Sequence, residues 1–442
     1  MLRPLHRLAF AAAVATAAAC GQPEDAANAP PPVLFEVFSF WETKGEKEAF
    51  EYIKREFEAL HPNTDVRNAA LGGGQQSQQI DLQERVYLRR PPHVFLANGG
   101  QGILEWVVFD RANTEEARLV QLEFAGDLLQ GFFHPAAARA VRYRGAPFGV
   151  PLSIHRDNLL FYNPELFREL EVEPPRTLDD LLALCPVFAE RGLIPLALGT
   201  KEDWTLHLLL EAVMIEVAGA EFYSAFWRGQ RTSPQALATL DRVLERLLEV
   251  RGCLDPSADR WAWHAAVEQV VGDTSGSGNV ARAAMAVMGD WAKGFLKAEG
   301  FRLGKDFDIA PFPGTERRFV MTVDAFAMLK GAPHPRLGTA FLKFIADPRI
   351  QLGFSRLKGS VPARQDVDDA GLDEHGRRTY RALAAEGTEV VYSIAMLLPQ
   401  QVVVALDTAL RSMFETGEGE NVRLMIRNHL PRIREHAALT DL

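Results

Sequence analysis

The 442-residue sequence has only three cysteines and lacks the features of several functional classes. Its formal net charge is −10 and it has no basic run, which argues against binding to a nucleic-acid backbone. No uncharged apolar stretch reaches about 18 residues, the length that predicts a membrane span. The chain also has no GxSxG, HExxH, CxxC or GxxxxGK[ST] motif. We therefore expect no enzymatic activity, no metal site and no cofactor.

The N-terminal segment predicts export. Residues 1–19 combine two arginines with a short apolar stretch and small residues, the arrangement of a secretory signal peptide. Cleavage after Ala19 would leave Cys20 as the first residue, and the preceding alanines resemble a bacterial lipobox without its usual leucine. Ordinary signal cleavage beside an incidental cysteine is the alternative. Residues 20–32 are polar and rich in Pro and Ala, as a tether between a lipid and a domain should be.

The rest of the chain alternates strand-like and helix-like segments. The run from Val33 to Trp41 is almost entirely apolar and aromatic, which predicts a strand buried on both faces. A helical pattern ending at Pro62 follows, then a second strand, a glycine loop, another helix and a third strand. This order predicts an α/β fold with a parallel sheet covered by helices on both faces. Strand patterns return after a mostly helical middle, which indicates two lobes that the chain crosses more than once.

Aromatic and charged residues stand where predicted strands and helices meet loops. They are Trp41, Glu46, Trp263, Trp291, Asp324 and Lys358. A single tryptophan is more often a core residue, but the whole set at such junctions favours a ligand site. The C–H face of a sugar packs against indole, and its hydroxyls bond to charged donors and acceptors. Ligands of open α/β sheets bind at the carboxyl ends of the strands. The pattern therefore predicts a carbohydrate site.

Seven stretches of the chain also carry a family resemblance. They are SFWETKGEKEAF, VPLSIHRDNLLFYNPELF, EVEPPRTLDDLLALC, AMAVMGDWAKGF, DFDIAPFPGT, VDAFAMLKGA and RLKGSVPAR. They are similar to the sugar-binding proteins of bacterial ABC importers, in the glucose/mannose-binding branch of the family 1 extracellular solute-binding proteins. The resemblance implies a two-lobed periplasmic-binding-protein fold with a hinge between the lobes. The N-terminal lobe would comprise about 33–145 and 310–362, and the C-terminal lobe about 146–309 and 363–442.

The resemblance implies a set of ligand-binding residues as well. These are Phe40, Trp41, Glu46, Gly73, Gly74, Asn98, His155, Trp263, Trp291, Asp324, Lys358 and Met396. Several positions depart from the family pattern. Phe40 replaces a tryptophan, Leu96 and Asn98 replace a glutamine and a histidine, and Met396 replaces a histidine. Because each lost polar partner removes about 0.5–1.5 kcal/mol of hydrogen bonding, we expect a site more apolar than a glucose site.

Cys185 and Cys253 are the only partners available to each other in an exported chain whose Cys20 carries lipid. Export favours a disulfide, with two buried free thiols as the alternative. The family has counterparts of both cysteines, and this resemblance favours the disulfide.

We expect a non-enzymatic periplasmic lipoprotein, monomeric and anchored to a bacterial membrane. It would capture a small carbohydrate, glucose or mannose or a related sugar, for the permease subunits of an ABC transporter. One alternative is a binding protein that reports its ligand to a receptor or kinase, and another is a site altered for a more apolar ligand. A carbohydrate-active enzyme with paired carboxylates is disfavoured, since no acid pair stands out by its spacing.

Overall fold

The structure is a computed structural model. It describes residues 31–70, 74–108, 118–272, 281–439 and 442. The predicted signal peptide, Cys20, most of the tether and Gly73 lie outside these ranges. Within the described part of the chain, no helix is both long and apolar enough to span a membrane.

The larger of two principal sheets has seven strands. Their order is β12 (Val361–Pro362), β6 (Val150–Arg156), β11 (Arg318–Ala327), β3 (Val94–Asn98), β1 (Val33–Phe38) and β2 (Thr64–Asn68), with β13 (Glu389–Tyr392) also paired to β11. Strand β1 is parallel to both of its neighbours, whereas β11 is antiparallel to β3 and β6. The sheet is therefore mixed, and the prediction of a parallel sheet was wrong for its centre. The first strand also ends three residues earlier than predicted, at Phe38.

The smaller sheet has four strands. In spatial order they are β10 (Asp308–Pro311), β7 (Leu159–Tyr162), β9 (Ala283–Met288) and β8 (Ile194–Ala197). Strand β9 is buried at every position, which explains its unbroken apolar sequence. A separate hairpin pairs β4 (Arg142–Tyr143) with β5 (Ala146–Pro147).

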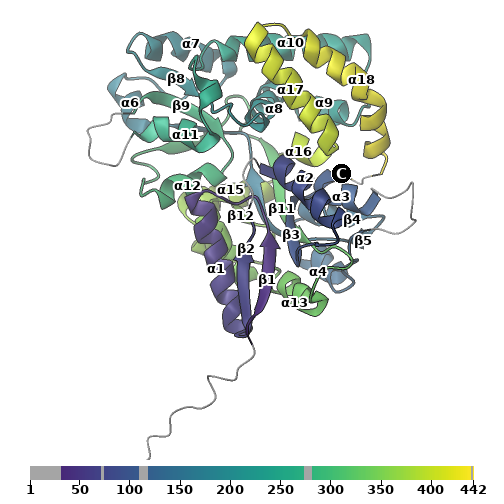
Figure 1. Ribbon diagram of the computed structural model, residues 1–442. Coiled ribbons are helices and arrows are strands. Elements are labelled where there is room, and N and C mark those ends of the chain that lie inside the picture. Colours follow the sequence, from purple (N-terminus) through teal and green to yellow (C-terminus); the bar gives the residue numbers. More distant parts are fainter. Residues whose placement is uncertain (1–30, 71–73, 109–117, 273–280, 440–441) are drawn as a thin grey trace, which may run out of the picture.

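Helices cover both sheets, so that each sheet forms the centre of one α/β lobe (Figure 1). Around the larger sheet lie α1 (Lys44–Leu60), α2 (Gly74–Tyr87), α3 (Gln101–Val108), α4 (Ala125–Phe132), α5 (Pro135–Arg139), α13 (Pro335–Ile345), α14 (Pro348–Lys358) and α15 (Glu374–Ala384). The other helices are α6 (Pro164–Glu169), α7 (Leu178–Ala189), α8 (Trp204–Ala218), α9 (Ala220–Trp227), α10 (Pro234–Arg251), α11 (Trp263–Val271), α12 (Trp291–Ala298), α16 (Ile394–Leu397), α17 (Gln400–Thr416) and α18 (Glu420–Ala437).

The chain passes between the lobes at β6–β7, at β10–β11 and again between β13 and α16. Strands β6 and β13 pair within the larger sheet, although the predicted boundaries assign both to the C-terminal lobe. Strand β10 ends the smaller sheet at Pro311, one residue beyond the predicted start of the second N-terminal segment. The crossing strands therefore belong to the sheet from which they leave.

Asn158 joins two of these crossings. Its Nδ2 donates to Thr315 Oγ1 and to the carbonyl of Arg318, both at 2.8 Å, and its Oδ1 accepts from the N–H of Val320 at 3.0 Å. The amide is buried. A buried amide with its donor and acceptor both bonded is stable where it lies, so Asn158 holds the two crossing segments side by side.

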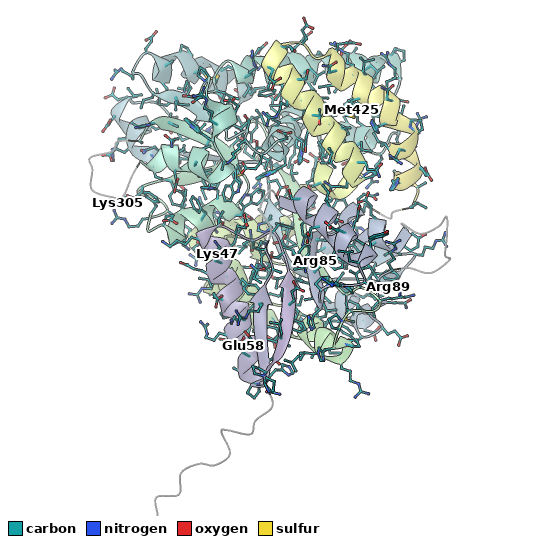
Figure 2. All side chains as sticks on the ribbon, viewed as in Figure 1. Lys47, Glu58, Arg85, Arg89, Lys305 and Met425 are labelled. Carbon is teal, nitrogen blue, oxygen red and sulfur yellow. A yellow bond between two sulfur atoms is a disulfide. The ribbon has the colours of Figure 1, made fainter. Side chains whose placement is uncertain are left out.

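A half-exposed arginine holds helix α2 against the larger sheet. Arg85 is labelled in Figure 2. Its guanidinium lies 2.6 Å from Glu36 Oε1 of β1 and 2.8 Å from Asp81 Oδ2, and it covers the ring of Phe38 at 4.4 Å. Since the ion pairs are partly solvated, each contributes at most about 1 kcal/mol. These contacts nevertheless hold α2, the helix that follows the predicted glycine loop, in place against the larger sheet.

The two described cysteines lie in the C-terminal lobe. The structure joins Cys185 of α7 to Cys253, just after α10, in a disulfide with a Cα–Cα distance of 5.5 Å. The bridge encloses helices α8, α9 and α10 within a sequence separation of 68 residues. It therefore constrains the helical part of this lobe.

Candidate functional site

A cavity of about 650 Å³ lies between the two lobes. This volume falls within the roughly 300–1,000 Å³ typical of small-molecule sites. Eight of the predicted ligand-binding residues line it: Phe40, Glu46, Asn98, His155, Trp263, Trp291, Asp324 and Lys358. They come from both lobes and from segments far apart in the sequence, so the fold brings most of the predicted set to one place.

One edge of the cavity is a face of the larger sheet. Asp324 of β11 pairs with Asn98 of β3, and Thr322 pairs with His155 of β6. Side chains alternate along a strand, so these four side chains point to the same face. The register between β6 and β11 shifts at Asp324/Ala325, and such irregularities redirect side chains next to binding sites. The sheet therefore presents a row of polar groups to the cavity.

His155 lies between two carboxylates. Its Nδ1 is 2.5 Å from Asp290 Oδ1 and its Nε2 is 3.1 Å from Asp324 Oδ2. Burial favours the neutral ring, but Asp290 and Asp324 outweigh this effect and raise the pKa of His155 to about 9. Burial would raise the pKa of Asp324, yet His155 and Lys358 together lower it. The site thus holds an imidazolium that donates to both carboxylates at neutral pH.

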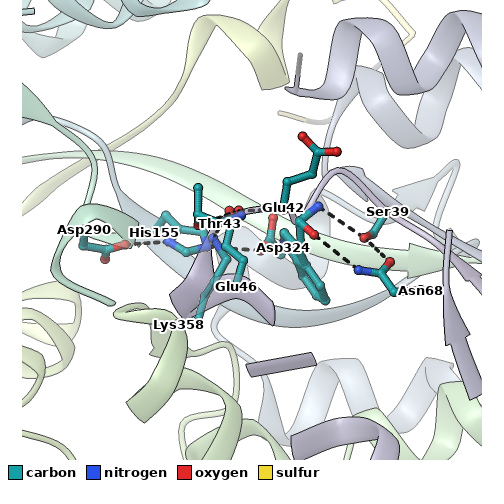
Figure 3. A network of polar contacts seen from close by, with 10 residues as sticks. Ser39, Glu42, Thr43, Glu46, Asn68, His155, Asp290, Asp324 and Lys358 are labelled. Atoms are coloured by element: carbon teal, nitrogen blue, oxygen red, sulfur yellow. Dashed lines mark hydrogen bonds and ion pairs between the residues drawn. The ribbon is translucent and has the colours of Figure 1, made fainter. Parts of the chain in front are cut away.

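Glu46 links the start of α1 to the end of α14. Its Oε2 accepts from the backbone N–H groups of Glu42 and Thr43 at 3.0 Å, as the third residue of a capping box does (Figure 3). Its Oε1 accepts from Lys358 Nζ at 3.0 Å. Both groups are almost fully buried. Glu46 therefore fixes the ammonium of Lys358 at the cavity wall.

Trp291 forms an aromatic wall beside this polar row. It is the first residue of α12, and its ring lies 5.5 Å from that of His155 in an edge-on arrangement. Lys358 Nζ lies 6.0 Å from the centre of the indole. A Cβ at Gly289 would come within 2.1 Å of the Trp291 ring. Glycine at this position therefore allows the indole to fold back over the turn.

Two further tryptophans line the cavity. Trp263 begins α11, and its ring contacts Phe295 with a centroid distance of 5.6 Å. The backbone N–H of Trp263 donates to Glu202 Oε2 at 3.0 Å. Trp204 begins α8 and lies 5.9 Å from Trp291. The sequence analysis missed Trp204 because it treated this region as a helical stretch. Its position at a helix start, which Trp263 and Trp291 share, is the signal that could have found it.

Trp41 and Met396 do not line the cavity. Trp41 is fully buried, with its ring against Phe354 at 5.0 Å and Phe326 at 5.7 Å. Because β1 ends at Phe38, the chain turns before Trp41 and directs this indole into the core. Met396 is likewise fully buried, against the glycines that follow β3. The structure therefore places both of these predicted ligand-binding residues in the core.

The remaining predicted positions add little to the lining. Leu96 is fully buried within β3. Gly74 is the first residue of α2. Phe40, which replaces the family's tryptophan, is half-buried and does line the cavity.

A second polar cluster at the cavity was not anticipated. Asp157 Oδ2 accepts from Thr322 Oγ1 at 2.5 Å, and Thr322 Oγ1 lies 2.7 Å from Ser393 Oγ. Glu211 Oε1 accepts from the hydroxyl of Tyr223 at 3.1 Å. All three crossings of the chain lie close to this cluster, because Asp157 follows β6, Thr322 belongs to β11 and Ser393 precedes α16.

Burial governs the ionisation of these acids. It raises the pKa of Asp157, and the nearby Glu211 raises it further. Burial also raises the pKa of Glu211 to about 7, against the opposing effect of His207. His207 itself lies 2.6 Å from Asp407 through its Nδ1. In the described ranges, no group of three or more His, Cys, Asp or Glu is arranged to hold a metal ion.

Comparisons with known proteins agree with this geometry. Residues 41–352 match the family model described as bacterial extracellular solute-binding protein. The chain is 28% identical over 367 residues to an uncharacterized ABC transporter extracellular-binding protein of Pyrococcus horikoshii, covering 81% of this chain and 78% of that protein. It is 29% identical over 359 residues to a probable sugar-binding periplasmic protein of Rhizobium meliloti, covering 80% and 81%.

A solved structure shows the same architecture. The bacterial solute receptor AcbH, described as preferring β-D-galactopyranose exclusively, superimposes with a TM-score of 0.73 over 91% of this chain and 97% of its own. At 15% identity this likeness concerns the fold alone. It confirms the predicted two-lobed fold.

Proposed function

Since the chain belongs to the family of bacterial extracellular solute-binding proteins, we propose that it captures a small sugar outside the cytoplasm and delivers it to the permease subunits of an ABC importer. Membership in this family agrees with the expectation that the chain binds its ligand without transforming it. The names of its relatives support the sugar, because the Rhizobium protein is described as sugar-binding.

The observation that carries the proposal is the combination of indole walls and polar edges around one cavity. Trp204, Trp263 and Trp291 offer flat apolar faces, on which the C–H face of a pyranose packs. Asp324 and Asn98 stand on the sheet beside them, where hydroxyl groups would project. A ligand held between the lobes in this way favours their closed arrangement.

A glucose- or mannose-like ring, or a related monosaccharide, fits this lining better than an apolar ligand does. Leu96 and Met396, which replace polar residues of the family pattern, lie in the core and leave the lining polar. Of the residues that depart from the family pattern, Phe40 and Asn98 line the cavity. These two departures alter two contacts and leave the charged residues of the cavity in place. We therefore infer a sugar whose hydroxyl pattern differs from that of glucose.

We further propose that the mature chain is a monomer anchored through a lipid on Cys20. The supporting observation is the sequence alone, with small residues before the cysteine and a polar tether after it. Mass spectrometry of protein extracted from membranes should find a diacylglycerol modification on Cys20. A soluble product that begins at another residue would contradict the anchor and leave the sugar proposal untouched.

The sugar proposal is tested by thermal unfolding of the exported domain in the presence of a panel of monosaccharides and disaccharides. A ligand at 100 times its dissociation constant stabilises the folded state by about 2.7 kcal/mol, which gives a clear rise in melting temperature. Any sugar that raises the temperature is then titrated by calorimetry, with Asp324→Asn as the site variant. Stabilisation by amino acids or peptides but by no sugar would refute the proposal.

A further inference from the structure

A short loop in the C-terminal lobe connects two of the tryptophans that line the cavity. Residues 199–203 lead directly into α8, whose first residue is Trp204. The same loop packs against the start of α11, whose first residue is Trp263, since the backbone N–H of Lys201 donates to the carbonyl of Trp261 at 3.0 Å. The two indoles lie far apart in the sequence, yet one piece of backbone sets the position of both.

The loop is held from two sides. A Cβ at Gly199 would come within 2.5 Å of the carbonyl oxygen of Ala262, the residue before α11, so glycine allows this close approach. On the other side, the guanidinium of Arg411 in α17 bonds to the carbonyl of Thr200 and to the carboxylate of Asp203. The loop therefore has a defined position relative to both α11 and α17.

Glu202 extends from this loop to the first turn of α11. Its Oε2 accepts from the backbone N–H of Trp263 at 3.0 Å. The first N–H groups of a helix have no partner within the helix, and a polar side chain just before the helix often accepts from one of them. In α11 that preceding residue is Ala262, which offers no such acceptor. Glu202 therefore caps α11 from a distant part of the chain, and its negative charge suits the positive end of the helix.

We propose that Glu202 is a positioning residue, which holds Trp204 and Trp263 at the separation that the ligand requires. This inference rests on the proposed function, because the cavity that Glu202 serves is the one proposed to hold the sugar. The hydroxyl of Thr205 donates to the carbonyl of Glu202 at 2.9 Å and so fixes the backbone on either side of Trp204. A gap of about 0.5–1 Å forfeits roughly a quarter to a half of the dispersion attraction between two groups. Small shifts of either indole therefore weaken its contact with a sugar ring.

A direct bond from Glu202 to a ligand hydroxyl is the competing role, because this residue also lines the cavity. The two roles require different chemistry. Capping the helix needs one acceptor oxygen, which the side-chain carbonyl of glutamine also offers. A charge-assisted bond to a hydroxyl needs the carboxylate and is roughly twice as strong as a bond between neutral groups. Replacement by glutamine therefore separates the two roles.

The experiment is calorimetric titration with D-glucose, D-galactose and D-mannose, using the one that binds the parent protein most tightly. Glu202→Ala should weaken its affinity about fivefold or more, the effect of one lost hydrogen bond, and Glu202→Gln should restore most of it. Asp180→Ala is the matched control. Asp180 accepts from the N–H of Thr177 at 2.9 Å and so caps α7, a fully described helix of the same lobe that contributes no residue to the cavity lining. This control should lower stability in urea unfolding and leave the affinity unchanged.

Hydrogen exchange of the empty proteins, followed by mass spectrometry, gives a readout that depends on no ligand. Glu202→Ala should speed exchange in peptides that cover the start of α11, because the backbone N–H of Trp263 loses its acceptor. Glu202→Gln and Asp180→Ala should both leave exchange in these peptides as it is in the parent protein.

Each outcome separates this inference from the proposed function. If Glu202→Ala leaves either the affinity or the exchange at α11 unchanged, the positioning role is refuted. Equal weakening by Glu202→Ala and Glu202→Gln assigns a direct ligand contact to the carboxylate and overturns the positioning role. If the parent protein binds no sugar of the wider panel, the proposed function fails, and exchange at α11 still decides whether Glu202 orders this helix. If Glu202→Ala fails to fold, Gly199→Ala displaces the same loop, and an unchanged affinity in that variant refutes the proposal.

Discussion

Trp41 and Trp291 were expected to play the same role, and the structure gives them different ones. Trp41 is fully buried between Phe326 and Phe354, whereas Trp291 is half-buried and borders the cavity. Replacing one tryptophan by alanine should therefore mainly lower stability, and replacing the other should mainly weaken ligand binding. The pair is well matched, since the chemical change is identical.

Trp41→Ala should lower the free energy of unfolding by about 3–5 kcal/mol, the cost of a large cavity in a packed core. Trp291→Ala should cost less, because its indole is only half-buried and borders the cavity. Its effect on binding should be larger. Loss of a central aromatic contact in a binding site typically costs about 2 kcal/mol, or roughly a thirtyfold weaker affinity.

Urea unfolding of the empty proteins measures the first quantity, and calorimetric titration with the best sugar of the panel measures the second. Trp41→Ala should bind with unchanged affinity per folded molecule, and Trp41→Phe serves as a milder variant if the alanine form unfolds. The reasoning is refuted if Trp291→Ala loses 3–5 kcal/mol of stability while its affinity stays the same, as expected of a core residue. Trp263→Ala then provides an independent check of the cavity.

Three further predictions follow from single contacts. Gly289→Ala should displace the indole of Trp291, because the added Cβ would lie 2.1 Å from the ring, and should weaken sugar binding in calorimetry. Replacing Cys185 and Cys253 by alanine together should lower the free energy of unfolding by roughly 2–5 kcal/mol in calorimetric melting, and an unchanged melt would contradict the disulfide. His155 should remain doubly protonated at about pH 8 in nitrogen NMR, since its pKa is raised to about 9. The stability that its charge contributes is complete below about pH 6.5 and is lost as the pH rises through about 9.

The sequence predicts the alternation of strands and helices well, because the spacing of apolar residues shows which face of each strand or helix is buried. The prediction fails at the ends of strands and helices, because the spacing of apolar residues does not show where an element stops. An apolar run through Trp41 does not reveal that the strand stops at Phe38, and those three residues decide whether the indole faces the core or a ligand. The antiparallel direction of β11 was missed for a related reason. A strand buried on both faces has the same continuous apolar sequence whether its neighbours run parallel or antiparallel to it.

The acidic cluster was missed although one signal for it was present. Helix α8 is buried along most of its length, and His207 and Glu211 interrupt its apolar sequence. A charged residue in such a helix needs a partner, so the two positions could have been marked as a polar site. Their partners could not have been named. Asp407 lies 200 residues from His207, and Tyr392, whose carbonyl accepts from Tyr223, lies 169 residues from that tyrosine.

The position of Asp157 relates this cluster to the movement of the lobes. Asp157 directly precedes Asn158, which joins two of the crossing segments, and its partner Thr322 contacts Ser393 at the third crossing. In a hinge motion, atoms near the rotation axis move least, and the crossings lie where that axis must pass. The hydrogen bonds from Ser393 through Thr322 to Asp157 should therefore persist in open and closed arrangements. Trp204 and Trp263, at the starts of α8 and α11 in the C-terminal lobe, would change their distance from the sheet face. A ligand can thus be held first at the acids and enclosed afterwards by the indoles.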